Sequence, residues 1–168
     1  DVTVDNDSAE AASVSLATDL YEVDAAGSRV GAAVASLPAV DLAVPAGGSA
    51  TAATGGTLPS PRLWGVAPAQ VPNLYDAITT VSRDGVVVDV YETRFGVRTL
   101  DYDPNQGLFV NGSHVKIQGV CNHHDLGALG AVANARGKER QLELLSELGA
   151  NAIRTAHNPE SPILYDLA

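Results

Sequence analysis

Residues 119–130 read GVCNHHDLGALG, and in this stretch two adjacent histidines and an aspartate directly follow a short apolar run. The apolar run, near Val115 to Val120, is typical of a buried strand. Polar side chains that gather at the end of such a strand are metal ligands, part of a substrate pocket, or an ordinary turn. The sequence on either side of the stretch helps to separate these three interpretations.

The residues after this stretch predict a helix, a second strand and a second helix. A helix is expected near 138–148, because leucines recur there close to the 3.6-residue repeat and Gly149 is placed to end it. A strand begins at Asn151, and Ser161-Pro162 combines an N-cap residue with a proline suited to the first helical turn. The order β-α-β-α is typical of a parallel α/β fold. In a closed (β/α)8 barrel, which takes about 250 residues, it corresponds to the first two units.

Residues 1–103 show a different pattern, with short runs of period two separated by Gly, Pro, Asp and Ser. Arg83-Asp84-Gly85 stands between two such runs and predicts a hairpin turn, because Asp-Gly tolerates positive φ angles. We therefore expect an immunoglobulin-like antiparallel β-sandwich over 1–103, followed by the partial barrel over 104–168. Alanine and glycine are frequent in 1–103, so the core of the sandwich is expected to be thin.

The charge balance narrows the classes of partner. The chain has 168 residues with 20 acidic and 10 basic side chains, a formal net charge of −10. Nucleic acid and membrane surfaces are poor partners for such a chain, since both need clustered Lys and Arg. Cys121 is the only cysteine, so no intrachain disulfide is expected and the cellular compartment stays undecided. Because the chain begins at Asp1 within a strand-like run and has no methionine, we expect it to be a processed or excised piece.

Two polar clusters follow the two predicted barrel strands. In parallel α/β folds, functional groups gather where strands end and loops begin. Neighbouring parallel strands would therefore bring both clusters to one edge of the sheet, and we predict a common pocket there. The clusters are Asn122, His123, His124 and Asp125 after the first strand, and Arg154, His157 and Asn158 at the end of the second.

Four stretches of the sequence resemble consecutive signatures of glycoside hydrolase family 2, the family of β-galactosidases, β-glucuronidases and β-mannosidases. They are LWGVAPAQVPNLYDAITTV (63–81), FGVRTLDYD (95–103), GLFVNGSHVKIQGVCNHHDLGALG (107–130) and LGANAIRTAHNPESPILYDLA (148–168). The resemblance implies a retaining glycosidase of the β-galactosidase type, which hydrolyses terminal β-glycosidic bonds of a carbohydrate substrate. It implies no cofactor and no metal.

The resemblance also assigns roles to individual residues. His123 matches the family's histidine on the first barrel strand, which contacts the sugar in the −1 subsite, and His157 matches a second-strand histidine with a similar role. Arg154 matches the arginine that lies beneath the catalytic nucleophile and orients it. The other predicted sugar contacts are His124, Asp125 and Asn158, the last standing where many family members have tyrosine.

Neither catalytic carboxylate of the family is expected in this chain. Retaining glycosidases use two carboxylates about 5–5.5 Å apart, and in this family both are glutamates on later barrel strands. The spacing of Glu139, Glu143 and Glu147 is that of a solvated helix face, and Glu160 and Asp166 lack a preceding Asn-Glu signature. The isolated chain is therefore expected to be inactive or very weakly active. Without the nucleophile, the guanidinium of Arg154 should be hydrated, paired with a local acid such as the Asp125 carboxylate, or paired across an interface.

Other interpretations of the same residues stay open. The adjacent His123 and His124 could bind a metal ion together with Asp125 and His157. Neighbouring strand residues point to opposite faces, so both adjacent histidines reach one ion only if the chain bends. Cys121 could be a nucleophile if it had a base and an electropositive setting; otherwise it is a small buried strand residue. Trp64 could stack on a sugar or anchor the sandwich core.

Three alternatives at the level of the whole chain also stay open. The sandwich could be a carbohydrate-binding or interaction module with vestigial barrel units. The chain could be an active incomplete barrel that self-association completes. Two parallel strands with exposed edges invite pairing with another chain, so self-association through these edges is expected as an alternative form.

Overall fold

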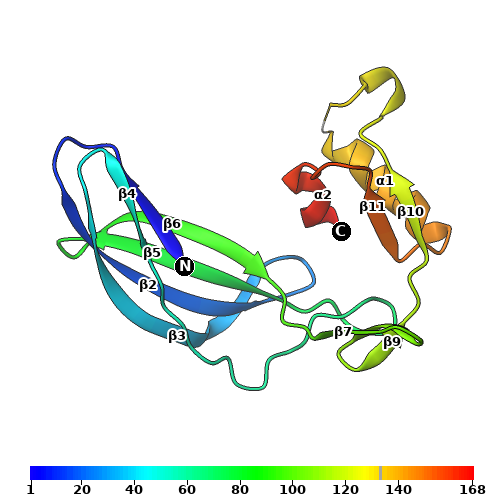
Figure 1. Cartoon of the computed structure of the whole chain (residues 1–168), viewed down its shortest axis with the longest axis horizontal. Coiled ribbons are helices and arrows are strands. Elements are labelled where there is room, and N and C mark those ends of the chain that lie inside the picture. Colours follow the sequence, from blue (N-terminus) through cyan, green and yellow to red (C-terminus); the bar gives the residue numbers. More distant parts are fainter. Residues whose placement is uncertain (133) are drawn as a thin grey trace. The chain divides into compact units, whose positions relative to one another are not determined.

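The computed structural model describes residues 1–132 and 134–168, and it divides them into two compact units. The first unit comprises Asp1–Arg98 and the second Thr99–Ala168. Figure 1 shows strands alone in the first unit, and strands with short helices in the second.

The first unit is an antiparallel β-sandwich. Its larger sheet has the strand order β3-β2-β5-β6, and its smaller sheet pairs β1 with β4. This arrangement confirms the predicted sandwich. The strands are β1 (Val2–Asn6), β2 (Ala12–Val23), β3 (Arg29–Val44), β4 (Gly48–Ala52), β5 (Leu74–Arg83) and β6 (Val86–Phe95).

The strand β3 is longer than its sequence pattern alone predicts. Residues 40–44, VDLAV, alternate between apolar and other residues as a strand does, whereas the first part, residues 29–39, contains four alanines, a glycine and a proline. That first part is a strand because it pairs with β2 as far as Val23↔Arg29, with register shifts on the way. Pairing with a neighbour has overridden a weak local preference for strand.

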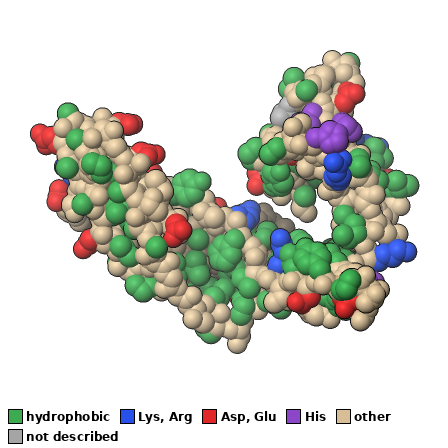
Figure 2. Space-filling view, in the orientation of Figure 1, with side chains coloured by type: hydrophobic (Ala, Val, Ile, Leu, Met, Phe, Trp, Pro, Cys, Tyr) green, Lys and Arg blue, Asp and Glu red, His purple; other side chains and the backbone are tan. Residues whose placement is uncertain are grey.

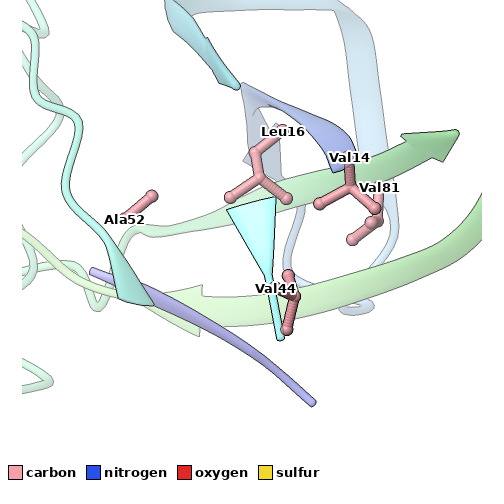
Figure 3. Packing of buried hydrophobic residues seen from close by; sticks show 5 residues of the cluster. All are labelled: Val14, Leu16, Val44, Ala52 and Val81. Carbon is pink, nitrogen blue, oxygen red and sulfur yellow. The ribbon is translucent and has the colours of Figure 1, made fainter. Parts of the chain in front are cut away.

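The core of the sandwich is small, as the composition predicts. Its buried cluster consists of Val14, Leu16, Val44, Ala52 and Val81 (Figure 3). Burying a side chain of this size contributes at most roughly 1.5–3 kcal/mol to the free energy of unfolding. The sandwich therefore depends on polar contacts as well.

A hairpin turn occurs at Asp84-Gly85, as predicted, and a second one occurs at Asn111-Gly112. Asp84 and Gly85 have φ angles of 52° and 77° between β5 and β6, and Asn111 and Gly112 have 53° and 74° in the second unit. Positive φ at both central residues matches the right-handed twist of the paired strands.

The second unit combines a three-stranded antiparallel sheet, β7-β8-β9, with the parallel pair β10-β11. Together with its helices it confirms the predicted β-α-β-α order. Its elements are β7 (Leu100–Asp103), β8 (Gly107–Val110), β9 (Ser113–Val115), β10 (Gly119–Asn122), the 3-10 turn η1 (Gly127–Leu129), α1 (Ala135–Glu147), β11 (Ala152–Thr155) and α2 (Pro162–Leu167). The part of the chain that the structure describes contains no helix long and apolar enough to cross a membrane.

The predicted strand near 115–120 is broken into β9 and β10. The side chain of Asn151 hydrogen-bonds to the backbone between them: its Oδ1 accepts from the N–H of Gln118 at 2.8 Å, and its Nδ2 donates to the carbonyl of Lys116 at 2.9 Å. The two strands belong to different sheets, β9 to the antiparallel sheet and β10 to the parallel pair.

Helix α1 begins earlier than the leucine pattern predicts. The side chain of Asn134 caps it by accepting from the N–H of Gly137 at 2.8 Å. Its end follows the prediction, with Gly149 at a φ of 91° just beyond the C-cap.

The ion pair between Asp76 and Arg94 makes a testable contribution to the sandwich. Asp76 is only 1% exposed, and its two carboxylate oxygens accept from Arg94 Nε at 2.9 Å and Nη2 at 3.1 Å. An asparagine at this position would lack the charge that answers the guanidinium. We therefore expect the substitution Asp76→Asn to lower the free energy of unfolding by about 2 kcal/mol in urea denaturation.

The matched control is Asp41→Asn at an exposed position of β3. This substitution should change the free energy of unfolding by less than about 0.5 kcal/mol. Equal effects of the two substitutions would contradict a stabilising role for the pair.

Candidate functional site

The parallel register of β10 and β11 brings the two predicted clusters together. Cys121 pairs with Arg154, and Asn122, the last residue of β10, pairs with Thr155, the last of β11. Both following loops therefore leave from one edge of the pair. Polar residues that are more than thirty positions apart in sequence become neighbours in this way.

His123, Arg154 and His157 lie together at this edge, as the sequence predicts. The rings of His123 and His157 are 6.0 Å apart between centroids and meet edge to face at 83°. Arg154 Nη2 lies 3.2 Å from His157 Nδ1. Figure 2 shows histidine side chains gathered on one surface of the second unit, next to a basic side chain. All three residues are exposed, so their nitrogen atoms are open to a ligand.

Arg154 has no carboxylate partner among the described residues. Apart from His157, its contact is with the Cys121 sulfur, 4.0 Å from Nη1. The thiol is exposed, which corrects the simpler expectation that Cys121 is a buried strand residue. Cys121 and Arg154 are paired residues, so the thiol lies on the same uncovered side of the strand pair as the exposed guanidinium.

A sharp turn aims His157 back toward Arg154. Ala156 has a φ of 40°, is 6% exposed, and donates its N–H to the Arg154 carbonyl at 2.8 Å. Positive φ is uncommon for a residue with a side chain and is often found at functional sites. Nothing in the sequence marks Ala156, because alanine carries no turn signal.

His124 points away from His123 and toward Glu160. Its Nδ1 lies 3.7 Å from Glu160 Oε2, and its Nε2 is buried without a hydrogen-bond partner among the described residues. The ring is one-third exposed. The predicted contact of His124 with sugar stays a prediction, but in this arrangement its polar neighbour is a carboxylate.

Lys138 and Glu160 form a buried ion pair that sequence reasoning missed. Lys138 Nζ lies 3.3 Å from Glu160 Oε1, and the two side chains are 3% and 1% exposed. Glu160 thus joins three segments: its own loop after β11, helix α1, and the loop after β10 through His124. No sequence signal could have revealed the pair, because lysine and glutamate in helices and loops usually face solvent. It fixes the position of both loops that carry the cluster.

The remaining predicted residues have local roles in the loops. The Asp125 carboxylate accepts from the N–H of Gly127 at 2.8 Å, and the Asn122 amide donates to Gln141 Oε1 at 3.3 Å. Asn158 is exposed, and its N–H donates to the Thr155 carbonyl at 3.3 Å. Asp125 therefore shapes its own turn rather than neutralising Arg154.

The acids of helix α1 pair with arginines on its solvated face. Arg136 Nη1 lies 2.7 Å from Glu139 and 3.0 Å from Glu143, and Arg140 adds a contact of 3.6 Å with Glu143. The hydrogen bond from Arg136 lowers the pKa of Glu143, and Glu139 and Glu143 together raise the pKa of Arg136. These glutamates are thus engaged away from the cluster.

The described residues contain no group of three His, Cys, Asp or Glu side chains arranged to hold a metal ion. The adjacent histidines explain this, because His123 turns toward His157 and His124 toward Glu160. What the edge presents instead is two imidazoles and a guanidinium, groups that hydrogen-bond to hydroxyl and carboxylate oxygens.

The sequence comparisons identify the family of this chain. The profile described as "Glycosyl hydrolases family 2" matches residues 1–98, and "Glycosyl hydrolases family 2, TIM barrel domain" matches residues 104–168. The chain belongs to glycosyl hydrolase family 2. It is a β-sandwich followed by a segment equivalent to the first two β-α units of a TIM barrel.

Similar proteins include sugar hydrolases of two kinds. Beta-galactosidase BoGH2A of Bacteroides ovatus is 46% identical over 111 residues, which are 66% of this chain and 13% of that protein. A beta-glucuronidase of Bacteroides fragilis is 36% identical over 107 residues, 64% of this chain and 15% of that protein. The crystal structure of Bacteroides uniformis beta-glucuronidase matches with a TM-score of 0.81 and 25% identity, over 98% of this chain and 19% of the other. The chain therefore spans less than a quarter of the length of these relatives.

The buried pair gives a prediction for the stability of the second unit. Removing one partner leaves a buried charge unanswered, so we expect Glu160→Ala to lower the free energy of unfolding by about 3 kcal/mol. The double variant Lys138→Met, Glu160→Ala should recover much of that loss, because no unpaired charge remains. Urea denaturation of the two variants measures both values.

A matched control for this experiment is Glu147→Ala on the exposed surface of α1. It should change the free energy of unfolding by less than about 0.5 kcal/mol. If Glu160→Ala behaved like this control, the pair would have no role in holding the loops.

Proposed function

We propose that this chain is part of a retaining glycoside hydrolase of the β-galactosidase type, which hydrolyses terminal β-glycosidic bonds. The observation that carries the proposal is the convergence of His123, Arg154 and His157 at the end of the parallel strand pair. Membership of glycosyl hydrolase family 2 supports it, and so does the named activity of the B. ovatus relative. The substrate class is a β-galactoside-like carbohydrate, without a cofactor or metal.

In this proposal the three residues bind and orient, but do not cleave. The exposed rings of His123 and His157 hydrogen-bond to hydroxyl groups of the sugar in the −1 subsite. Arg154 holds the carboxylate of the nucleophile, which another part of the enzyme supplies. The hydroxyl partners would further include His124, Asp125 and Asn158.

The chain itself supplies neither catalytic carboxylate. A retaining mechanism needs two carboxyl groups about 5–5.5 Å apart, one as nucleophile and one as acid/base. Two acids lie in the loops that carry the cluster, and both are engaged: Asp125 holds the N–H of Gly127, and Glu160 is buried against Lys138. Cleavage therefore requires polypeptide beyond these 168 residues.

The proposed domain division places the sandwich in 1–103 and the barrel segment in 104–168.

The barrel segment has one edge of β10 and one of β11 without a strand partner among the described residues. Free parallel edges attract further strands. Self-association through these edges is thus an alternative way to complete the sheet. The alternative function is that of a carbohydrate-binding module that does not cleave its ligand.

An activity assay on the purified chain tests whether the chain can cleave a glycoside by itself, as an active incomplete barrel would. We expect no release of nitrophenol from p-nitrophenyl β-D-galactoside above the buffer rate, either for the unmodified chain or for His157→Ala and Glu160→Gln. The physical reason is the lack of a carboxylate pair. Circular dichroism verifies that each variant is folded.

Robust hydrolysis that disappears in Glu160→Gln would show that a local acid performs the chemistry, and the proposed division of labour would fail. The gene provides a second test of the proposal. The coding sequence downstream of Ala168 should continue the barrel with a strand that ends in Asn-Glu.

A further inference from the structure

Glu160 is a buried carboxylate with a different partner at each of its two oxygen atoms. Oε1 lies 3.3 Å from Lys138 Nζ, and Oε2 lies 3.7 Å from His124 Nδ1. The side chain is 1% exposed, and the backbone N–H donates to the Tyr165 hydroxyl at 3.2 Å. Glu160 is therefore held by contacts with α1, with α2 and with the loop after β10.

The two loops that carry the paired histidines meet at this carboxylate. His124 directly follows His123, and Glu160 stands three positions after His157. The rings of His123 and His157 meet edge to face with their centroids 6.0 Å apart. A buried link between the loops thus lies close in sequence to each ring of the pair.

Helix α1 holds the first of these loops at a second point, through Gln141. Its Oε1 accepts from the Asn122 amide at 3.3 Å, and its Nε2 donates to the Asp125 carbonyl at 3.3 Å. These two bonds lie on either side of the adjacent histidines in the sequence. Gln141 stands three positions after Lys138, so both side chains lie on one face of the helix. One face of α1 therefore holds both loops.

The surroundings of His124 favour one form of its neutral ring. An ionised carboxylate accepts hydrogen bonds and cannot donate them, so the ring nitrogen that faces Glu160 carries the proton. The other nitrogen, Nε2, is buried without a hydrogen-bond partner among the described residues. A proton at Nε2 would be a buried donor without an acceptor, which costs free energy. Both observations indicate the Nδ1–H tautomer of His124, with Glu160 as the group that selects it.

We propose that Glu160 is a positioning residue of the sugar-binding site. Its carboxylate holds the His124 ring on one side and Lys138 on the other. In this way it sets the distance between the rings of His123 and His157. Because Glu160 is buried, it acts through these two rings and does not contact the ligand.

The effect on sugar binding rests on the proposed function, in which both rings contact hydroxyl groups of one sugar. The effect on ring geometry does not, because it concerns the protein without ligand. A ligand that meets side chains already in place does not have to pay for ordering them. The bridging carboxylate therefore raises the affinity for the sugar without touching it.

The test compares two double variants that differ only at the bridging position. Lys138→Met, Glu160→Leu removes both charges and the acceptor for His124. Lys138→Met, Glu160→Gln removes both charges but keeps an amide oxygen that can accept from His124. Neither variant leaves a buried charge without its partner, so both should fold. Circular dichroism verifies this.

NMR of the histidine rings in the ligand-free chain measures the positioning. At about pH 8, where histidine is ordinarily neutral, the unmodified chain should show His124 mainly as the Nδ1–H tautomer. A nuclear Overhauser effect should connect the rings of His123 and His157. We expect the Glu160→Gln double variant to keep both signals. The Glu160→Leu double variant should lose the tautomer preference and weaken the Overhauser effect at least twofold.

Titration with methyl β-D-galactopyranoside measures the consequence for binding. The Glu160→Leu double variant should bind about threefold more weakly than the Glu160→Gln double variant. The control is Val110→Ala, which destabilises the same unit at a buried position of β8, away from the bridging carboxylate. This control should change neither the tautomer nor the Overhauser effect, so it separates positioning from a general loss of stability.

Three results would overturn the proposal. The first is a major Nε2–H tautomer of His124 in the unmodified chain, which needs no variant to fold. The second is the same ring geometry in the two double variants, and the third is an equal change of geometry in Val110→Ala. Ring geometry that changes as expected, in a chain that binds no sugar in any form, would support the positioning role and contradict the proposed function.

Discussion

The parallel pairing of β10 with β11 is the constraint on which the candidate site depends. Four residue pairs, from Gly119↔Ala152 to Asn122↔Thr155, set the register. A parallel pair needs a crossover connection, and α1 provides it. Because both strands end at the same level, the residues that follow them face a common space. A shift of one position would turn Arg154 away from that space, since strand side chains alternate between faces.

Apolar burial alone gives this strand pair little support. The fully buried apolar residues described in the second unit are few: Val110, Ala156 and Leu164. Polar contacts supply much of the remaining order. The Asn151 amide holds the chain before β10, and the Lys138–Glu160 pair ties the loop after β11 to α1. A buried ion pair costs desolvation energy, so it adds little net stability, but removing one partner leaves the other charge unanswered. The Lys138–Glu160 pair therefore keeps the loop that carries His157 against α1.

The features that the sequence predicts correctly are those with local signals. The Asp84-Gly85 turn, the cap at Gly149 and the alternation in β2 and β5 each depend on residues close in sequence. The convergence of His123 with Arg154 and His157 was also predictable, because it follows from the rule that parallel strands end at one edge.

The features that sequence reasoning missed depend on contacts between distant residues. The first part of β3 is strand only because β2 lies beside it. The positive φ of Ala156 and the burial of Lys138 against Glu160 appear only when loops and helix are packed together. Alanine, lysine and glutamate have no pattern that announces such roles. The direction of His124 is a further case, since its neighbour His123 has the same side chain and points elsewhere.

The most direct test of the proposed sugar-binding site is NMR of the four histidine rings during titration with methyl β-D-galactopyranoside. The ring signals of His123 and His157 should shift together, with one dissociation constant in the millimolar range, because two loops bury only part of a sugar. His114, which packs edge to face on Phe109 in the β8-β9 hairpin, should stay unchanged and serves as the internal reference. Shifts of His114 alone, or different dissociation constants for His123 and His157, would contradict a common site at the ends of β10 and β11.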